Sequence, residues 1–189
     1  MERERELGVL SALIEAACRG TGQLAVVEGA AGIGKTRLLA ATRAEAQQAG
    51  MRVLGARGSE LEREFAYGVV RQLFEPALTS AGHAGRTELL SGAAGQAAVL
   101  LGHVDAAAAS STGGDVSFAT LHGLYWLAAN LCARKPLMLV VDDLHWSGVP
   151  SLRFLTYLLS RLDGLPLLVL VGLRPAEPVA DQHLARLRL

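Results

Sequence analysis

Apolar and polar positions alternate along this chain in two patterns. Short, nearly continuous apolar runs predict buried strands, whereas longer segments repeat their apolar residues at helical spacing. Because strands and helices alternate and each strand is apolar on both faces, we expect a parallel sheet covered by helices on both sides. The strands are expected at residues 24–27, 51–56, 137–141 and 167–171, and the helices at about 3–19, 37–49, 67–78, 118–132 and 151–162.

One long stretch follows neither pattern. Residues 79–115 are rich in Ala, Gly and Ser, a composition that offers few large side chains to bury. We therefore expect a poorly ordered insertion there, with residues 106–114 forming a mobile surface loop. The chain as a whole, residues 1–189, is expected to be a single domain.

A glycine-rich segment follows the first predicted strand. Residues 29–36 match the phosphate-binding loop, G-x-x-x-x-G-K-[ST]. Glycines let the backbone wrap round phosphates, and the helix that follows offers free N–H groups and the positive end of its dipole. Lys35 is expected to reach the β- and γ-phosphates and Thr36 to bind Mg²⁺; the alternative is a turn that binds nothing. The expected nucleotide contacts in this segment are Gly29, Ala30, Ala31, Gly32, Ile33, Gly34, Lys35, Thr36 and Arg37.

Two carboxylates end the third predicted strand. In a parallel sheet the carboxyl ends of the strands face the ligand, so Asp142 is expected beside the Mg²⁺ that Thr36 binds. Asp143 is expected either to orient or deprotonate the attacking water, or to serve only as a helix N-cap or loop-stabilising carboxylate. Together with the upstream loop, this pair predicts an α/β P-loop NTPase, a three-layer sandwich.

Further polar residues reach the same edge of the predicted sheet. Arg174 follows the fourth strand and can sense the γ-phosphate and stabilise transition-state charge, or it is a solvated loop arginine. His145 and Trp146 follow the two acids and can read the nucleotide state, although packing is the more common role of such a Trp. The other histidines share no metal-binding spacing.

Composition and charge limit the possible functions. Of the 189 residues, 51% are hydrophobic and 19% charged, and the formal net charge is zero, so no overall basic field attracts nucleic acid. Cys18 and Cys132 are expected to be buried thiols rather than a disulfide. The apolar runs are too short to span a bilayer, and the charged first six residues do not resemble a signal peptide. We expect a soluble cytoplasmic protein.

With these motifs in place, the chain resembles the AAA-like ATPase domain of the large ATP-binding LuxR-family regulators, which belong to the STAND class of signal-responsive NTPases. The likeness covers nearly the whole chain. The segments from Gly58 to Pro76 and from Asp142 to Trp146 are much more specific than the phosphate-binding loop alone. The matching segments are residues 3–7, 27–39, 58–65, 70–76, 141–146 and 173–177.

The resemblance implies roles for individual residues. Arg3, Glu4 and Leu7 would lie near the adenine, Asp142 would hold Mg²⁺, Asp143 would activate water, and Arg174 would act as the sensor after the fourth strand. It also implies a switch set by bound ATP or ADP, with slow hydrolysis and nucleotide-dependent self-association.

Family members continue beyond the ATPase core. The final strand, a helical lid, a sensor region and a helix-turn-helix would follow Leu189, so the chain is expected to be a C-terminally truncated core. Any contact with DNA would then be made by that missing C-terminal domain. An autonomous ATPase and a non-functional fragment remain alternatives.

Overall fold

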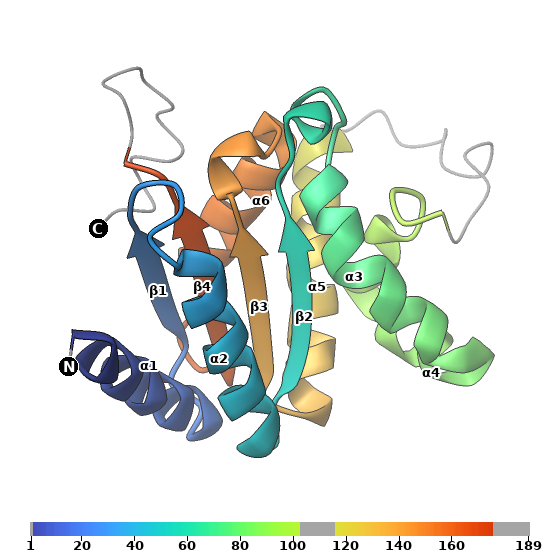
Figure 1. Ribbon diagram of the computed structural model, residues 1–189. Helices are drawn as coiled ribbons and strands as arrows, with labels where there is room; N and C mark the ends of the chain where they lie inside the picture. The colour runs from blue at the N-terminus through green and yellow to red at the C-terminus, as the bar shows by residue number, and fades with distance from the viewer. Residues whose placement is uncertain (1, 103–115, 176–189) are drawn as a thin grey trace.

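The computed structural model describes residues 2–102 and 116–175, and only the backbone of residues 2, 3, 61, 62, 116 and 117. Its sheet has four parallel strands in the order β1-β4-β3-β2 (Figure 1). The predicted parallel sheet is confirmed, and each strand begins and ends within two residues of its predicted bounds. The strands are β1 (Gln23–Glu28), β2 (Arg52–Arg57), β3 (Leu137–Asp142) and β4 (Leu167–Leu173).

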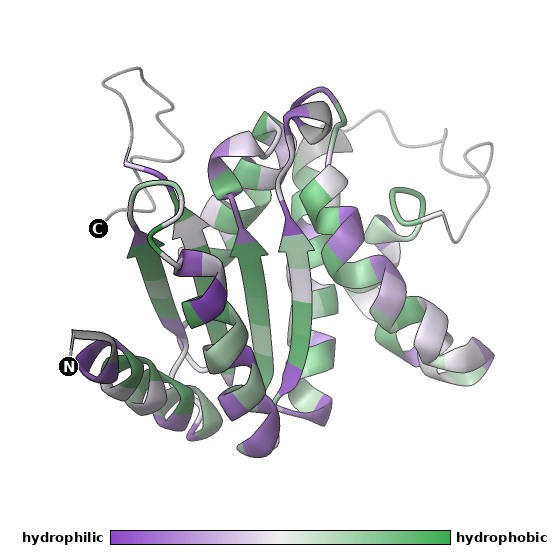
Figure 2. Ribbon diagram, viewed as in Figure 1, coloured by the Kyte–Doolittle hydropathy of each residue, from purple (hydrophilic) through white to green (hydrophobic). Residues whose placement is uncertain are grey.

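The two central strands explain why their sequences are almost wholly apolar. Every residue of β3 and β4 is buried, whereas most residues of the edge strands β1 and β2 are only half-buried. Side chains of β3 alternate between two cores: Leu139 and Val141 face one, Met138 and Val140 the other. Because both faces are covered, neither can be polar, and the strands are correspondingly hydrophobic in Figure 2.

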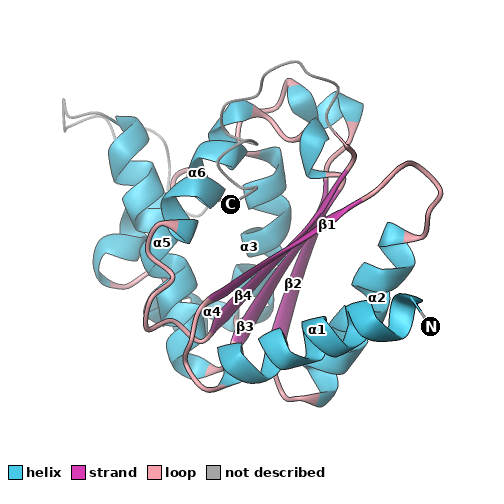
Figure 3. Ribbon diagram, turned by 90° about the vertical axis from the view of Figure 1, so that its left-hand side faces the viewer, coloured by secondary structure: helices cyan, strands magenta, loops and turns pink. Residues whose placement is uncertain are grey.

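Helices cover both faces of the sheet, which gives the predicted three layers (Figure 3). On one face lie α1 (Glu2–Cys18) and α2 (Lys35–Gln48), which share one core cluster with the sheet. The larger core cluster lies on the other face. Its layer contains α3 (Gly68–Ser80), α4 (Gly82–Leu89), α5 (Val116–Arg134), α6 (Val149–Leu159) and the 3₁₀ helices η1 (Glu60–Arg63), η2 (Gly92–Ala97) and η4 (Leu144–Trp146).

The expectation of a poorly ordered insertion is wrong for residues 79–102. This stretch contains the end of α3, then α4 and η2, and Leu89, Ala94 and Ala97 are buried in the larger core. Small residues permit close packing here, because a Cβ at Gly123 of α5 would lie 2.7 Å from the backbone nitrogen of Ala97. Residues 103–115, including the loop expected at 106–114, lie outside the described residues.

The two cysteines are free thiols, as expected, but they differ in burial. Cys132 is buried in the larger core, whereas Cys18 is half-buried at the end of α1. Burial raises the pKa of the Cys132 thiol to about 12. Within the described ranges, none of the helices combines the length and apolarity needed to cross a membrane.

Candidate functional site

Residues 29–34 connect β1 to α2 at the carboxyl edge of the sheet, and residues 35 and 36 begin α2 (Figure 1). We call residues 29–36 together the glycine-rich loop. Its glycines are needed for its shape. Gly32 and Gly34 have φ values of 79° and 97°, a region that other residues rarely adopt. A Cβ at Gly29 would lie 2.9 Å from Cγ2 of Ile33. The predicted residues therefore form one compact turn ahead of the helix N-terminus.

Lys35 begins α2 and turns back over this loop. Its ammonium donates hydrogen bonds to the carbonyl oxygens of Gly29 (2.7 Å) and Ala30 (3.0 Å), and the residue is only 8% exposed. An ammonium whose hydrogen-bond partners are neutral carbonyls can exchange them for an anion. The loop thus carries a fixed positive charge at its centre.

Thr36 and Asp142 meet across the gap between α2 and β3. The Thr36 hydroxyl donates to Oδ2 of Asp142 at 2.8 Å, and the backbone N–H of Asp143 donates to its Oδ1 at 3.0 Å. Asp142 is 9% exposed. Gly172 of β4 provides the space, because a Cβ there would lie 2.8 Å from Asp142 Oδ1.

These two oxygen groups suit magnesium rather than a metal that prefers nitrogen or sulfur. The described residues contain no group of three or more His, Cys, Asp or Glu that could hold a metal ion. A cation at Thr36 and Asp142 would therefore depend on oxygens from a ligand or from water. Mg²⁺ usually binds in this way, through one or two carboxylates plus phosphate oxygens.

Asp143 adopts the left-handed conformation (φ 51°), which is uncommon for a residue other than glycine. It precedes η4 but makes no side-chain capping bond, so a simple N-cap does not explain it. Its carboxylate, 13% exposed, pairs with Arg57 (Nη2–Oδ2 3.2 Å) and approaches Arg174 (Nε–Oδ1 4.0 Å). Arg174 therefore lies at the site, where it remains 46% exposed.

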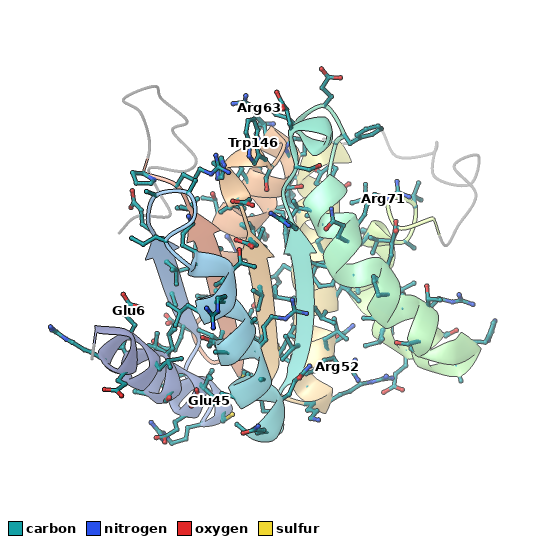
Figure 4. The ribbon with its side chains drawn as sticks, in the orientation of Figure 1. Glu6, Glu45, Arg52, Arg63, Arg71 and Trp146 are labelled. Atoms are coloured by element: carbon teal, nitrogen blue, oxygen red, sulfur yellow. The ribbon has the colours of Figure 1, made fainter. Side chains whose placement is uncertain are left out.

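His145 and Trp146 continue the edge of the site. Both ring nitrogens of His145 are buried without a hydrogen-bond partner among the described residues. Burial lowers the pKa of this imidazole, while the charge of Asp143 acts in the opposite direction. The guanidinium of Arg63 lies 5.6 Å from the ring centre of Trp146, and both labelled side chains stand above the carboxyl ends of the strands (Figure 4). This Trp therefore packs against η1.

Three cations lie close to the two carboxylates of the site. Lys35 stands beside Thr36, the partner of Asp142, and Arg57 and Arg174 approach Asp143. Cations beside a helix N-terminus favour an anion.

The remaining predicted nucleotide contacts are Arg37 and Arg3. Arg37 is exposed in the first turn of α2. Arg3 lies in the first turn of α1, and its side chain is outside the described part of the chain.

Residues 1–170 match the family model of the AAA ATPase domain. The chain belongs to the AAA ATPase family. Nucleotide binding is the activity common to such domains. In this AAA ATPase domain the glycine-rich loop, Lys35, Thr36 and Asp142 gather at the carboxyl edge of the sheet. No curated protein matches the chain.

Solved structures resemble the AAA ATPase domain at low identity. A DNA replication initiation factor is 15% identical with a TM-score of 0.50, over 99% of this chain and 44% of that one. Caenorhabditis elegans PCH-2 is 11% identical (TM-score 0.48, 98% and 40%). Drosophila ORC bound to AT-rich DNA and Cdc6 is 13% identical (TM-score 0.45, 98% and 55%). At 15% identity, the likeness to the DNA replication initiation factor supports the fold alone. The chain spans about half the length of these three proteins or less.

Several residues of the site escaped the sequence analysis of this AAA ATPase domain. Arg57 ends β2 opposite Asp142 in the strand register and pairs with Asp143. Gln72 of α3 fixes the end of β2 by bonding both the N–H and the C=O of Arg57. Gly172 makes room for Asp142. The position of Arg57 at the end of a predicted strand was an available signal, because all such positions share the ligand edge.

Proposed function

We propose that this AAA ATPase domain binds ATP and ADP together with Mg²⁺ at the loop of residues 29–36. The contact of 2.8 Å between Thr36 Oγ1 and Asp142 Oδ2 carries the proposal. It brings together two oxygen atoms that can ligate a metal ion and that belong to residues 106 positions apart in the sequence. Both lie near the buried ammonium of Lys35. A hydroxyl, a carboxylate and an ammonium beside a helix N-terminus form the set that a magnesium-bound polyphosphate requires.

Each side chain has one role in binding. Lys35 exchanges its two carbonyl partners for phosphate oxygens, and the N–H groups of the loop and of the first turn of α2 surround the remaining oxygens. Thr36 and Asp142 hold the metal. When bound, Mg²⁺ neutralises phosphate charge and polarises the bond to the γ-phosphate.

Hydrolysis in this proposal depends on Asp143 and Arg174. Asp143 orients the attacking water and accepts its proton, and Arg174 stabilises the charge that develops on the γ-phosphate. The ion pair with Arg57 opposes the first role, because the guanidinium occupies Oδ2 of Asp143, an oxygen that could otherwise accept a hydrogen bond from the water. The left-handed backbone of Asp143 is the kind of strain that accompanies switch regions. We therefore expect slow hydrolysis.

The biological role that we propose is the ATP-binding switch module of a LuxR-type regulator of the STAND class. The segments from Gly58 to Pro76 and from Asp142 to Trp146 support it, because they resemble that class beyond the phosphate-binding loop. In this role bound ATP or ADP sets the conformation and self-association, the module itself does not touch DNA, and it works in the cytoplasm. The free thiols Cys18 and Cys132 suit that compartment.

The experiment is phosphate release at saturating Mg·ATP, measured beside the affinities for ATP and ADP. A switch predicts tight binding of both nucleotides and turnover well below about 1 s⁻¹, the low end for typical enzymes. Asp143→Asn should lower this rate by about 10²-fold or more and preserve binding. Asp163→Asn changes an exposed acid after α6 and should have no effect. Rapid turnover by the wild type would contradict the switch and favour an autonomous ATPase.

A further inference from the structure

Five rings gather on the outer side of α5 and α6, in the helical layer opposite α2. They are Phe118, His122, Tyr125, Trp126 and Tyr157, which we call the ring cluster. It contains four of the nine Phe, Trp and Tyr residues of the whole chain. Nothing in the nucleotide site uses it, because Lys35 and Thr36 belong to the opposite layer of the sheet.

The rings of the cluster form a closed circle of neighbours. Phe118 stacks on His122 at 6.0 Å and meets Tyr157 edge-on at 6.1 Å. Tyr125 meets Tyr157 at 6.2 Å and Trp126 at 5.7 Å, and Trp126 meets His122 at 6.2 Å, all at 77–80°. Pairs at these separations attract one another beyond simple burial, so each ring is held by two others.

Hydrogen bonds fix the same rings. Trp126 Nε1–H donates to Nε2 of His122 at 3.0 Å, so Nε2 carries no proton. The proton of this neutral imidazole is then on Nδ1, which donates to the hydroxyl oxygen of Tyr157 at 3.2 Å. The polar atoms of Trp126 and His122 are therefore satisfied inside the cluster. Because these contacts already hold the rings in place, less side-chain entropy is lost when a partner binds.

Packing of the core does not account for the aromatic residues of the ring cluster. The opposite side of α5 already supplies the core through Leu124, Leu127 and Leu131, each fully buried. Phe118 and Trp126 lie eight residues apart on the same side of the helix, and they are 56% and 42% exposed. Exposed aromatic residues that are held rigidly at helical spacing are typical of binding hot spots.

Charge indicates the chemistry of the partner. Arg153 on α6 and Arg161 just after its end are exposed, four residues either side of Tyr157. The guanidinium of Arg161 lies 3.8 Å from the ring centre of Tyr157. Neither α5 nor α6 contains an Asp or Glu, and Asp163 follows α6. Helices that carry aromatic residues and arginines but no carboxylates have the composition of an interface core. A partner that complements this face must bring the carboxylates.

We propose that the ring cluster with Arg153 and Arg161 is a docking site for an acidic polypeptide segment that carries apolar anchor residues. Its carboxylates pair with the two arginines, and its apolar side chains cover Phe118 and Trp126. A polypeptide fits better than a nucleic acid, because two arginines on a chain of zero net charge supply few phosphate contacts. Binding at this face does not require nucleotide.

The test uses two fluorescein-labelled synthetic peptides with leucines at helical spacing, one with glutamates and the other with lysines at all remaining positions. Fluorescence anisotropy without nucleotide should give at least about tenfold tighter binding of the glutamate peptide. Trp126→Ala should weaken it by about tenfold or more. Phe65→Ala removes another exposed aromatic residue, beside α3, and should change the affinity less than about twofold.

A charge-reversed variant tests the arginines separately from the packing. Arg153→Glu with Arg161→Glu should reverse the preference towards the lysine peptide, while Arg5→Glu on α1 should not. If Trp126→Ala does not fold, the affinities of Trp126→Phe and of the charge-reversed variant for the two peptides still test whether the ring cluster is the docking site.

Three outcomes would overturn the proposal. They are equal binding of the two peptides, an unchanged affinity after charge reversal, and tighter binding of single-stranded DNA than of the glutamate peptide. Because nucleotide is omitted, failure here is distinguishable from failure of the nucleotide site.

Discussion

Gly172→Ala tests how the sheet positions the carboxylate of Asp142. Gly172 lies in β4, one residue beyond the Val141–Val171 pair of the β3–β4 register. An added Cβ would lie 2.8 Å from Asp142 Oδ1 and 3.1 Å from Cδ1 of Leu39. The first distance is shorter than a Cβ contact can be, and Asp142 is short, buried and next to the backbone, so it must move away.

The expected cost follows from the two ways to relieve this contact. If Asp142 stays in place, overpacking costs about 1–3 kcal/mol. If it turns aside, it loses the hydrogen bond from Thr36, which for a charged acceptor contributes about 1.5–3 kcal/mol. These costs are alternatives, so we expect the free energy of unfolding to fall by about 2 kcal/mol. The affinity for Mg·ATP should fall about tenfold, or 1.4 kcal/mol.

Urea denaturation gives the free energy of unfolding, and calorimetric titration gives the affinity with and without Mg²⁺. The matched control is Gly8→Ala in α1, where nothing lies within 4 Å of an added Cβ. It should raise stability by about 0.5–1 kcal/mol, because alanine favours a helix interior. A Gly172→Ala variant as stable as the wild type, with unchanged dependence on Mg²⁺, would refute the reasoning.

Three further substitutions have expected results. Arg57→Ala should raise the rate of phosphate release at saturating Mg·ATP several-fold, because it removes the ion pair that holds Asp143. It should lower the free energy of unfolding by less than about 1 kcal/mol, because Arg57 is 70% exposed. A slower rate would contradict the proposal that Arg57 restrains Asp143. Above its ordinary pKa the Cys132 thiol ionises in the unfolded chain but not in the folded one, where burial raises its pKa to about 12. Wild-type stability should therefore fall relative to Cys132→Ala by about 1.4 kcal/mol per pH unit between roughly pH 9 and 12, as denaturation across that range would show. Burial lowers the pKa of His145. Below about pH 6.5 the imidazole is therefore protonated in the unfolded chain before it is protonated in the folded chain, and the free energy of unfolding falls as the pH falls. His145→Phe should reduce that acid-side loss, and an identical pH profile would disprove it.

The parts of the fold that follow from local pattern were predictable from sequence. The strands β3 and β4 are buried on both faces, so their apolar runs are continuous and easily recognised. Residues 79–102 were misjudged because Ala and Gly suggest disorder by composition. In the structure their small size permits close packing of η2 on Gly123, which is a tertiary property.

The site shows the same division. The proximity of Lys35, Thr36 and Asp142 could be predicted, because the proposed chemistry requires fixed residue types at fixed distances from a strand end. The roles of Arg57 and Gly172 depend on which strands are neighbours and on their register. Strand order cannot be derived from the spacing of apolar residues along the chain. The side-chain partners of Asp143 could not be predicted for the same reason.

Binding of Mg·ATP to the wild-type chain, to Lys35→Ala and to Lys135→Ala tests the central claim most directly. These are the only two lysines in the sequence, and Lys135 is exposed after α5, so the two variants remove the same side chain from different places. The affinity of Lys35→Ala for Mg·ATP should be lower than that of the wild type by about tenfold or more, whereas Lys135→Ala should bind Mg·ATP as the wild type does. Equal affinity of all three folded proteins, or no binding by the wild type, would contradict the nucleotide site.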